Sequence, residues 1–241
     1  MSNRRTTLGK RQIIKTSILV LIASLCALAM AGCNLDPQFD PELARVSTPR
    51  AGQLPYYQGR VMDPVWPDGK LPDDLRGMRA FDLVAESGKP FTPAEMRGKI
   101  SLVYFFFSRC RGICPVVTAN VKRVAEKIGE APDVQVVAIT VDPEHDTPVA
   151  LEQYRKTYTL RKDNWSLLTG QRPQIEAIAR EQFAGDIQTR KGLGNLIDFV
   201  HTENLFLVDK EGYLRGIYRL RGMGDSDRFF KDFQVLRSSE A

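Results

Sequence analysis

The distribution of apolar residues divides the chain into three parts. An uninterrupted apolar run covers residues 16–31, and a proline-rich stretch with little apolar periodicity covers residues 34–75. From about residue 76 onward, short apolar runs alternate with segments in which apolar positions recur every three to four residues. The short runs are typical of buried strands and the spaced positions of amphipathic helices, so this last part predicts one α/β domain.

Strands and helices alternate along the first half of that domain. The strands are expected at 100–107, 134–141 and 165–168, and the helices that follow them at 115–128, 147–158 and 172–183. Proline stands in the first turn of the first two helices, where its missing N–H leaves no hydrogen bond unmade. This alternation predicts a parallel sheet with helices packed on it.

The end of the chain has a different pattern. Residues 204–208 and 213–218 predict two strands joined by a turn at 210–212, and Asp225 is the expected cap of a final helix. An alternating core followed by an antiparallel hairpin and a helix is the element order of a thioredoxin-like fold. We therefore expect residues 76–241 to form a thioredoxin-like α/β domain, with a central mixed sheet flanked by helices.

Residues 1–32 have the order of an export signal. Five basic residues and no acidic residue precede the apolar run, whose 16 residues are fewer than a membrane-spanning helix prefers. The segment Met30-Ala-Gly-Cys33 resembles a bacterial lipoprotein box, which predicts lipidation of Cys33; an uncleaved signal anchor is the alternative. Both interpretations place the proline-rich tether, residues 33–75, and the domain after it outside the cytoplasm and attached to a membrane.

The charge balance argues against nucleic-acid binding. The formal net charge is +5, from 34 Lys and Arg residues against 29 Asp and Glu residues. The five basic residues of the export segment account for this whole excess, so residues 33–241 carry equal numbers of basic and acidic side chains. A domain without net positive charge lacks the usual electrostatic basis for binding phosphate backbones.

The cysteines narrow the candidate chemistry. After Cys33 the only cysteines are Cys110 and Cys114, which lie between the first core strand and its helix. Sulfurs one helical turn apart can face the same point, and this suits a structural disulfide, a redox-active dithiol or a shared metal ion. The helix N-terminus and the neighbouring Arg109 and Arg111 are expected to lower the pKa of the thiols.

His201 bears on the choice among these uses. It lies just before residues 204–208, in the loop that faces the dithiol in a thioredoxin-like fold. Disulfide oxidoreductases of this fold normally carry a cis-proline there, and this loop has no proline. Two thiolates and one imidazole suit Cu(I) better than a closed four-ligand zinc site. A thiol peroxidase is disfavoured, because neither cysteine has a Thr or Ser three residues before it.

Three segments carry a family resemblance. Residues 105–115, 139–148 and 201–209 resemble the SCO family of copper-binding assembly proteins, and the likeness spans about residues 78–236. It implies a membrane-tethered domain that assists formation of the dinuclear copper centre of cytochrome c oxidase. One departure is Arg111-Gly112 between the cysteines, where the family often has Pro-Asp. This departure leaves the three predicted copper ligands unchanged. The added positive charge of Arg111 would affect which partner protein the domain binds.

The resemblance also implies a ligand set. Cys110, Cys114 and His201 would bind one copper ion, with Cu(I) as the favoured oxidation state and Cu(II) as the second candidate. Asp142 matches the family's acidic residue after the second core strand, and it is expected near the site but not as a ligand.

The loop that contains Asp142 holds two further polar candidates. Asp142 and Asp146 are expected to brace the loop by accepting hydrogen bonds from backbone N–H groups, as short acidic side chains commonly do. His145 lies between acidic residues and is expected to be a solvated loop histidine rather than a ligand.

The leading hypothesis is an extracytoplasmic, membrane-tethered copper metallochaperone. It would pass copper to a cytochrome c oxidase subunit or another cuproprotein, and it would not be an enzyme in the turnover sense. The alternative is a thiol:disulfide reductase of the same fold, in which Cys110 and Cys114 keep the cysteines of a cuproprotein partner reduced. A third class is a redox or copper sensor. The first two differ at His201, because only the chaperone needs its imidazole to bind copper tightly.

Overall fold

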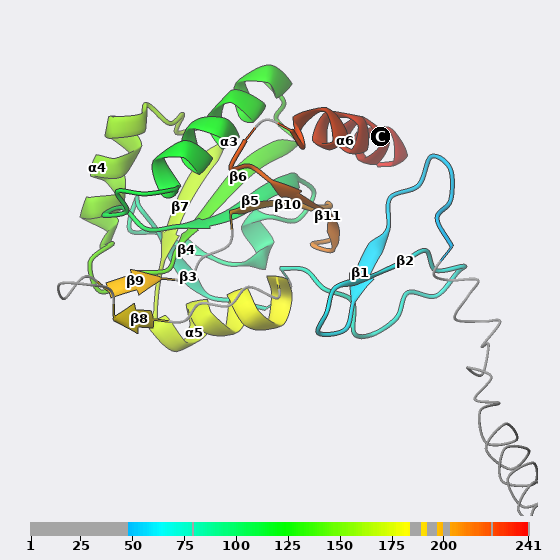
Figure 1. Ribbon diagram of the computed structural model, residues 1–241, viewed down its shortest axis with the longest axis horizontal. Helices are drawn as coiled ribbons and strands as arrows, with labels where there is room; N and C mark the ends of the chain where they lie inside the picture. Colours follow the sequence, from blue (N-terminus) through cyan, green and yellow to red (C-terminus); the bar gives the residue numbers. More distant parts are fainter. Residues whose placement is uncertain are drawn as a thin grey trace, which may run out of the picture. The chain divides into compact units, whose positions relative to one another are not determined.

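A seven-stranded mixed sheet forms the centre of the domain (Figure 1). The computed structural model describes residues 48–78, 80–183, 189–191, 197–199, 203–222 and 224–240. The strands are β3 (Leu83–Ala85), β4 (Pro90–Phe91), β5 (Ile100–Phe106), β6 (Val134–Thr140), β7 (Trp165–Thr169), β10 (Asn204–Val208) and β11 (Leu214–Arg219). Their order across the sheet is β11-β10-β5-β6-β7-β3-β4. The predicted thioredoxin-like fold, with its mixed sheet and terminal hairpin, is confirmed.

Strands β5 and β6 form the buried centre of the sheet. Every residue of both strands is buried, as their continuous apolar runs predict. They pair in parallel along their whole length, from Ile100 opposite Val134 to Phe106 opposite Thr140. Strand β7 continues the parallel part, whereas β10 pairs with β5 in the antiparallel sense. Because β5 and β6 end at the same edge of the sheet, the loops that follow them are neighbours.

Helices cover both faces of the sheet. Figure 1 shows α3, α4 and α6 over one face and α5 over the other. Their bounds are α3 (Cys114–Ile128), α4 (Pro148–Tyr158), α5 (Arg172–Ala177) and α6 (Ser226–Ser239), with a π-helical turn η2 (Ile178–Gln182) after α5 and a 3-10 turn η1 (Pro93–Glu95) before β5. The helices that sequence periodicity predicts after the three parallel strands are therefore all present.

Alternate aromatic side chains of β5 fix the helices on the two faces. Phe106 packs on Tyr154 of α4 with ring centroids 4.8 Å apart. Phe105 points to the other face, where its ring centroid lies 5.6 Å from that of Phe183. Successive side chains of a strand point to opposite faces, so one run of aromatic residues serves both layers of the core.

The chain before residue 76 contributes to the fold. The proline-rich composition of residues 33–75 predicts an extended tether, yet β1 (Tyr56–Gln58) and β2 (Asp63–Val65) form a small antiparallel sheet within this range. The side chains of Leu54 and Leu75 are buried against the body. Arg215 of β11 donates to the carbonyl oxygens of Leu54 and Pro55, each at 3.0 Å.

Two further features complete the fold. Strands β8 (Thr189–Lys191) and β9 (Ile197–Phe199) pair as a separate antiparallel hairpin. Within the described residues, no helix combines the length and the apolar character needed to cross a bilayer. The predicted export segment, residues 1–32, lies outside the described residues.

Candidate functional site

The two cysteines lie where β5 gives way to α3. Cys114 is the first residue of the helix and is buried, whereas Cys110 is only half-buried. The backbone N–H of Cys114 donates to Sγ of Cys110 over 3.4 Å, and neither cysteine takes part in a disulfide. The N-cap residue of α3 offers no side-chain acceptor. The two cysteines lie between strand and helix as the sequence predicts, and the sulfur of Cys110 accepts a hydrogen bond at the helix N-terminus.

The environment of Cys114 holds its thiol neutral. A hydrogen bond between the two cysteine side chains and the burial of Cys114 both raise the pKa of this thiol. The sequence-based expectation of a lowered thiol pKa is therefore wrong for Cys114. The helix N-terminus favours a thiolate, but here the sulfur lies in the core, where a charge has no water to solvate it.

The arginine beside Cys110 is drawn away from the thiols. Arg109 donates to Oδ2 of Asp142 through Nη2 at 2.6 Å and through Nε at 3.2 Å. Asp142 is buried in the loop after β6, with 1% of its side chain exposed. Arg111 is exposed, and within the described part of the chain it makes no ion pair. Asp142, the acidic residue expected near the site, therefore binds Arg109, which directly precedes Cys110.

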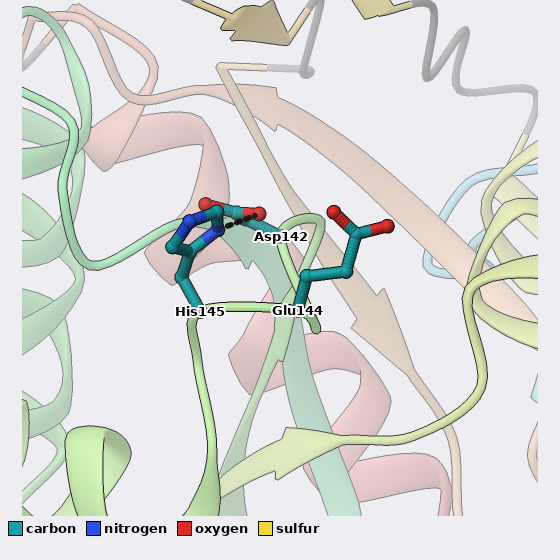
Figure 2. A group of neighbouring side chains, drawn as sticks. All are labelled: Asp142, Glu144 and His145. Carbon is teal, nitrogen blue, oxygen red and sulfur yellow. Dashed lines mark hydrogen bonds and ion pairs between the residues drawn. The ribbon is translucent and has the colours of Figure 1, made fainter.

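Asp142 also holds His145 (Figure 2). Nδ1 of His145 lies 2.9 Å from Oδ1 of Asp142 and 2.8 Å from Nη2 of Arg109. A protonated Nδ1 donates to the carboxylate, whereas an unprotonated Nδ1 accepts from the guanidinium, so the two bonds exclude each other. The histidine is 44% exposed, and in either protonation state of Nδ1 it bonds to one member of the Asp142–Arg109 pair.

Asp142, Glu144 and His145 bring ligand atoms within 4.8 Å of one another, which is close enough to consider a metal ion. Figure 2 shows the imidazole turned toward Asp142 and the Glu144 carboxylate turned away from it. Nε of Arg172 lies 3.0 Å from Oε1 of Glu144, and Arg109 occupies Asp142. Two guanidinium groups already balance the two carboxylates, so the group is an ion-pair network and a poor cation site.

Asp146 joins the loops that follow β5 and β6. Its carboxylate is fully buried and accepts the backbone N–H of Ser108 at 3.0 Å. The hydroxyl groups of Ser108 and Thr140 also donate to it. The expected role was to accept backbone N–H groups of its own loop, whereas the backbone N–H that the Asp146 carboxylate accepts belongs to Ser108 in the neighbouring cysteine loop. Sequence reasoning missed that the braced residue lies in the cysteine loop, although the parallel strands predict that these loops are neighbours.

Two of the predicted site residues, His201 and Cys33, lie outside the described residues. The strand that follows His201 in sequence is described. The antiparallel register pairs Leu205 of β10 with Tyr104 of β5, so the start of β10 lies at the edge of the sheet where β5 leads to Cys110.

Comparison with known proteins decides the family. The sequence profile of the SCO1/SenC family matches residues 70–231. The chain belongs to the SCO1/SenC family. The SCO1 protein homolog of Bacillus subtilis (strain 168) is 31% identical over 134 residues, which cover 55% of this chain and 68% of that protein.

Solved structures give the same result for this SCO1/SenC chain. BsSco, described as a member of the Sco family of cytochrome c oxidase assembly proteins with a disulfide switch, has a TM-score of 0.58 and 26% identity, covering 68% of this chain and 94% of that one. Arabidopsis thaliana ScoI with copper bound has a TM-score of 0.55 and 29% identity, covering 66% of this chain and 98% of that one. The resemblance noted in the sequence is thereby confirmed.

Proposed function

We propose that this SCO1/SenC protein is an extracytoplasmic, membrane-tethered copper metallochaperone for cytochrome c oxidase or another cuproprotein. Cys110, Cys114 and His201 hold one copper ion in this proposal, with Cu(I) favoured over Cu(II). The observation that carries it is the pair of thiols at the start of α3, with Sγ of Cys110 fixed 3.4 Å from the Cys114 backbone nitrogen. The copper-bound plant relative, at 29% identity, supports the choice of metal.

The chemistry of the donors fits copper as cargo. Thiolates are soft ligands that select Cu(I), and a third soft or imidazole ligand completes a trigonal site. The raised pKa of Cys114 means that the metal-free protein carries a proton on this sulfur, which copper must displace on binding. Arg109 is neutralised by Asp142 and so does not oppose the arrival of a cation.

The unequal exposure of the two sulfurs suggests the order of transfer. Cys110 is half-buried, whereas only 2% of Cys114 is exposed. An incoming ligand of a partner reaches copper from the side of Cys110 and replaces that sulfur first. Cys114 and the helix behind it keep hold of the ion until the partner has enough ligands to retain it.

The thiol:disulfide reductase remains the second candidate, and the same difference in exposure supports it. Cys110 as thiolate would attack a disulfide of the partner, forming a mixed disulfide and releasing one partner thiolate. Cys114, after losing its proton, would then attack Cys110. The partner would leave as a dithiol, and this chain would end with a Cys110–Cys114 disulfide. The disulfide switch described for BsSco is consistent with such a cycle.

The deciding experiment measures copper binding by the full chain with reduced thiols under anaerobic conditions. Wild type is compared with Cys110→Ala, Cys114→Ala and His201→Ala in competition with a Cu(I) chelator. We expect one copper ion per wild-type chain and a copper affinity lower by more than about a hundredfold in each variant. Removing a metal ligand lowers the affinity more than removing a residue that only hydrogen-bonds to a ligand.

The other histidine provides the matched control. His145→Ala also removes an imidazole, but from the Asp142 network, and we expect a change of less than about tenfold. If wild type binds no copper tightly, or if His201→Ala binds it as wild type does, the chaperone proposal fails. Wild type and the four variants are then assayed for reduction of a disulfide in a cysteine-containing copper-site peptide.

Membrane attachment is proposed to occur through a lipid on Cys33. The full chain, expressed in a bacterium, should be found in the membrane fraction and carry a labelled fatty acid. Cys33→Ser should lose the label. If Cys33→Ser stays in the membrane and wild type carries no label, the uncleaved signal anchor is the correct interpretation.

A further inference from the structure

Asp146 is a buried carboxylate that ties the cysteine loop to the centre of the sheet. It is 0% exposed, and its three hydrogen-bond donors come from two segments. Thr140 is the last residue of β6 and donates its hydroxyl, while Ser108 donates both its backbone N–H and its hydroxyl. Ser108 stands two residues before Cys110. The bonds therefore cross from one β-strand end to the loop that carries the sulfur.

The next residue of that loop is held from the same side. Arg109 is bound by Asp142, so both residues that precede Cys110 are fixed by the loop after β6. Beyond them, the backbone N–H of Cys110 donates to Phe107 at 3.2 Å, and its sulfur accepts from Cys114 at 3.4 Å. The bonds from Ser108 and Thr140 to Asp146, here called the Asp146 clamp, hold the sulfur of Cys110 on one side, and α3 holds it on the other.

We propose that Asp146 is a positioning residue that holds the sulfur of Cys110 beside that of Cys114. It does not touch the thiols or a metal ion. The inference follows from the burial of this carboxylate and from its bonds to Ser108, and it rests on the proposed function only where copper is concerned. Without the clamp, Cys110 samples more conformations. The effective concentration of its sulfur at the sulfur of Cys114 therefore falls.

The dithiol–disulfide equilibrium measures this effective concentration directly. In glutathione buffer, the two thiols of Cys110 and Cys114 react with one oxidised glutathione to give the intramolecular disulfide and two reduced glutathione molecules. Two S–H bonds and one S–S bond are exchanged for the same kinds of bond, so atoms and electrons balance. Looser positioning of Cys110 lowers the equilibrium constant for forming the disulfide.

Asp146→Ala is the principal variant of the full chain. We expect its equilibrium constant for disulfide formation to fall on the order of tenfold, which corresponds to about 30 mV for a two-electron couple. Ser108→Ala removes one donor and should move the constant in the same direction by a smaller factor. Asp146→Asn keeps an acceptor oxygen and should recover most of the wild-type value. If Asp146→Ala does not fold, Ser108→Ala and Asp146→Asn still test the clamp.

Asp209→Ala is the matched control. Asp209 is also a buried carboxylate with 1% exposure, and it accepts the backbone N–H of Tyr213 at 2.7 Å. It lies after the end of β10, and β10 leads away from the cysteine edge of the sheet. Its loss should lower thermal stability and leave the disulfide equilibrium within about twofold of wild type. The comparison separates positioning from general destabilisation.

A folded Asp146→Ala protein whose disulfide equilibrium stays within twofold of wild type would overturn the proposal. The same holds if Asp209→Ala shifts the equilibrium as much as Asp146→Ala does. Copper titration of the same proteins adds a second readout, with an expected tenfold loss for Asp146→Ala. If wild type binds no copper, the proposed function fails, but the glutathione measurement still decides the role of Asp146.

Discussion

If Cys114 binds copper as proposed, copper binding should depend on pH through the protonation state of this one buried thiol. The hydrogen bond with Cys110 and burial raise the pKa of Cys114 above its ordinary value of 9.0. Cys114 therefore carries a proton throughout the physiological range, and copper must displace that proton to bind the sulfur. For each displaced proton, the apparent copper affinity rises tenfold per pH unit, or about 1.4 kcal/mol.

The size of the change in copper affinity with pH distinguishes this site from one whose thiols have ordinary pKa values. From pH 6 to pH 9, the proton of Cys114 alone predicts a rise of about a thousandfold in affinity, or about 4 kcal/mol. For a thiol with the ordinary pKa of 9.0, the contribution to the pH dependence of copper affinity levels off above about pH 9. A thiol with a raised pKa continues to add a slope of one beyond that point. The window above pH 9 is therefore the informative one.

The assay is anaerobic competition between the full chain and a Cu(I) chelator from pH 6 to pH 10, corrected for the chelator's own titration. Wild type should keep a slope of at least one decade per pH unit above pH 9. Cys114→Ser should bind weakly and lose one unit of slope, because the displaced thiol proton is gone. If the wild-type affinity is constant above pH 9, the thiol of Cys114 is not held neutral and the reasoning from its burial is refuted.

Three further predictions concern stability. Phe105→Ala should lower the free energy of unfolding by about 3–5 kcal/mol in denaturant titration, because the ring packs on Phe183 and is 2% exposed. Burial raises the pKa of Asp209 to about 6. Its protonated form therefore contributes fully to the free energy of unfolding below pH 4, and this contribution, on the order of 2 kcal/mol, is lost as the pH rises through 6. In denaturant titrations at several pH values, Asp209→Asn should not show this loss. Gly77→Ala should lower the melting temperature, because its Cβ would collide with the carbonyl oxygen of Gly212.

The central sheet could be predicted from sequence because its signal is local. Residues 100–106 and 134–140 are apolar except for Ser101, Gln135 and Thr140, and such a run has few alternatives to a strand buried on both faces. The position of Cys110 and Cys114 follows equally directly, since the first core strand must end before the proline of the next helix. Each of these inferences uses only neighbours in sequence.

The partners of the charged residues could not be predicted, because they come from distant parts of the chain. Arg109 was expected to act on the thiols beside it, but its carboxylate partner lies 33 residues later. Proline content likewise suggested a tether up to residue 75, yet Arg215 binds the backbone at Leu54 across 161 residues. A hydrogen bond across that separation leaves no periodic trace in the sequence, so only the folded chain reveals it.

The Asp142–Arg109 ion pair reduces the positive charge that Arg109 and Arg111 place beside Cys110. Two arginines flanking a thiol would place two positive charges in the path of a copper ion. With Arg109 bound to a buried carboxylate at 2.6 Å, the pair has no net charge, and of the two arginines that flank Cys110 only Arg111 lacks a carboxylate partner among the described residues. A single solvated charge is weakly felt at high dielectric constant and is screened within about 10 Å at 0.1 M salt. In the proposed copper site, the charge of Arg111 would therefore oppose the entry of a copper ion only weakly.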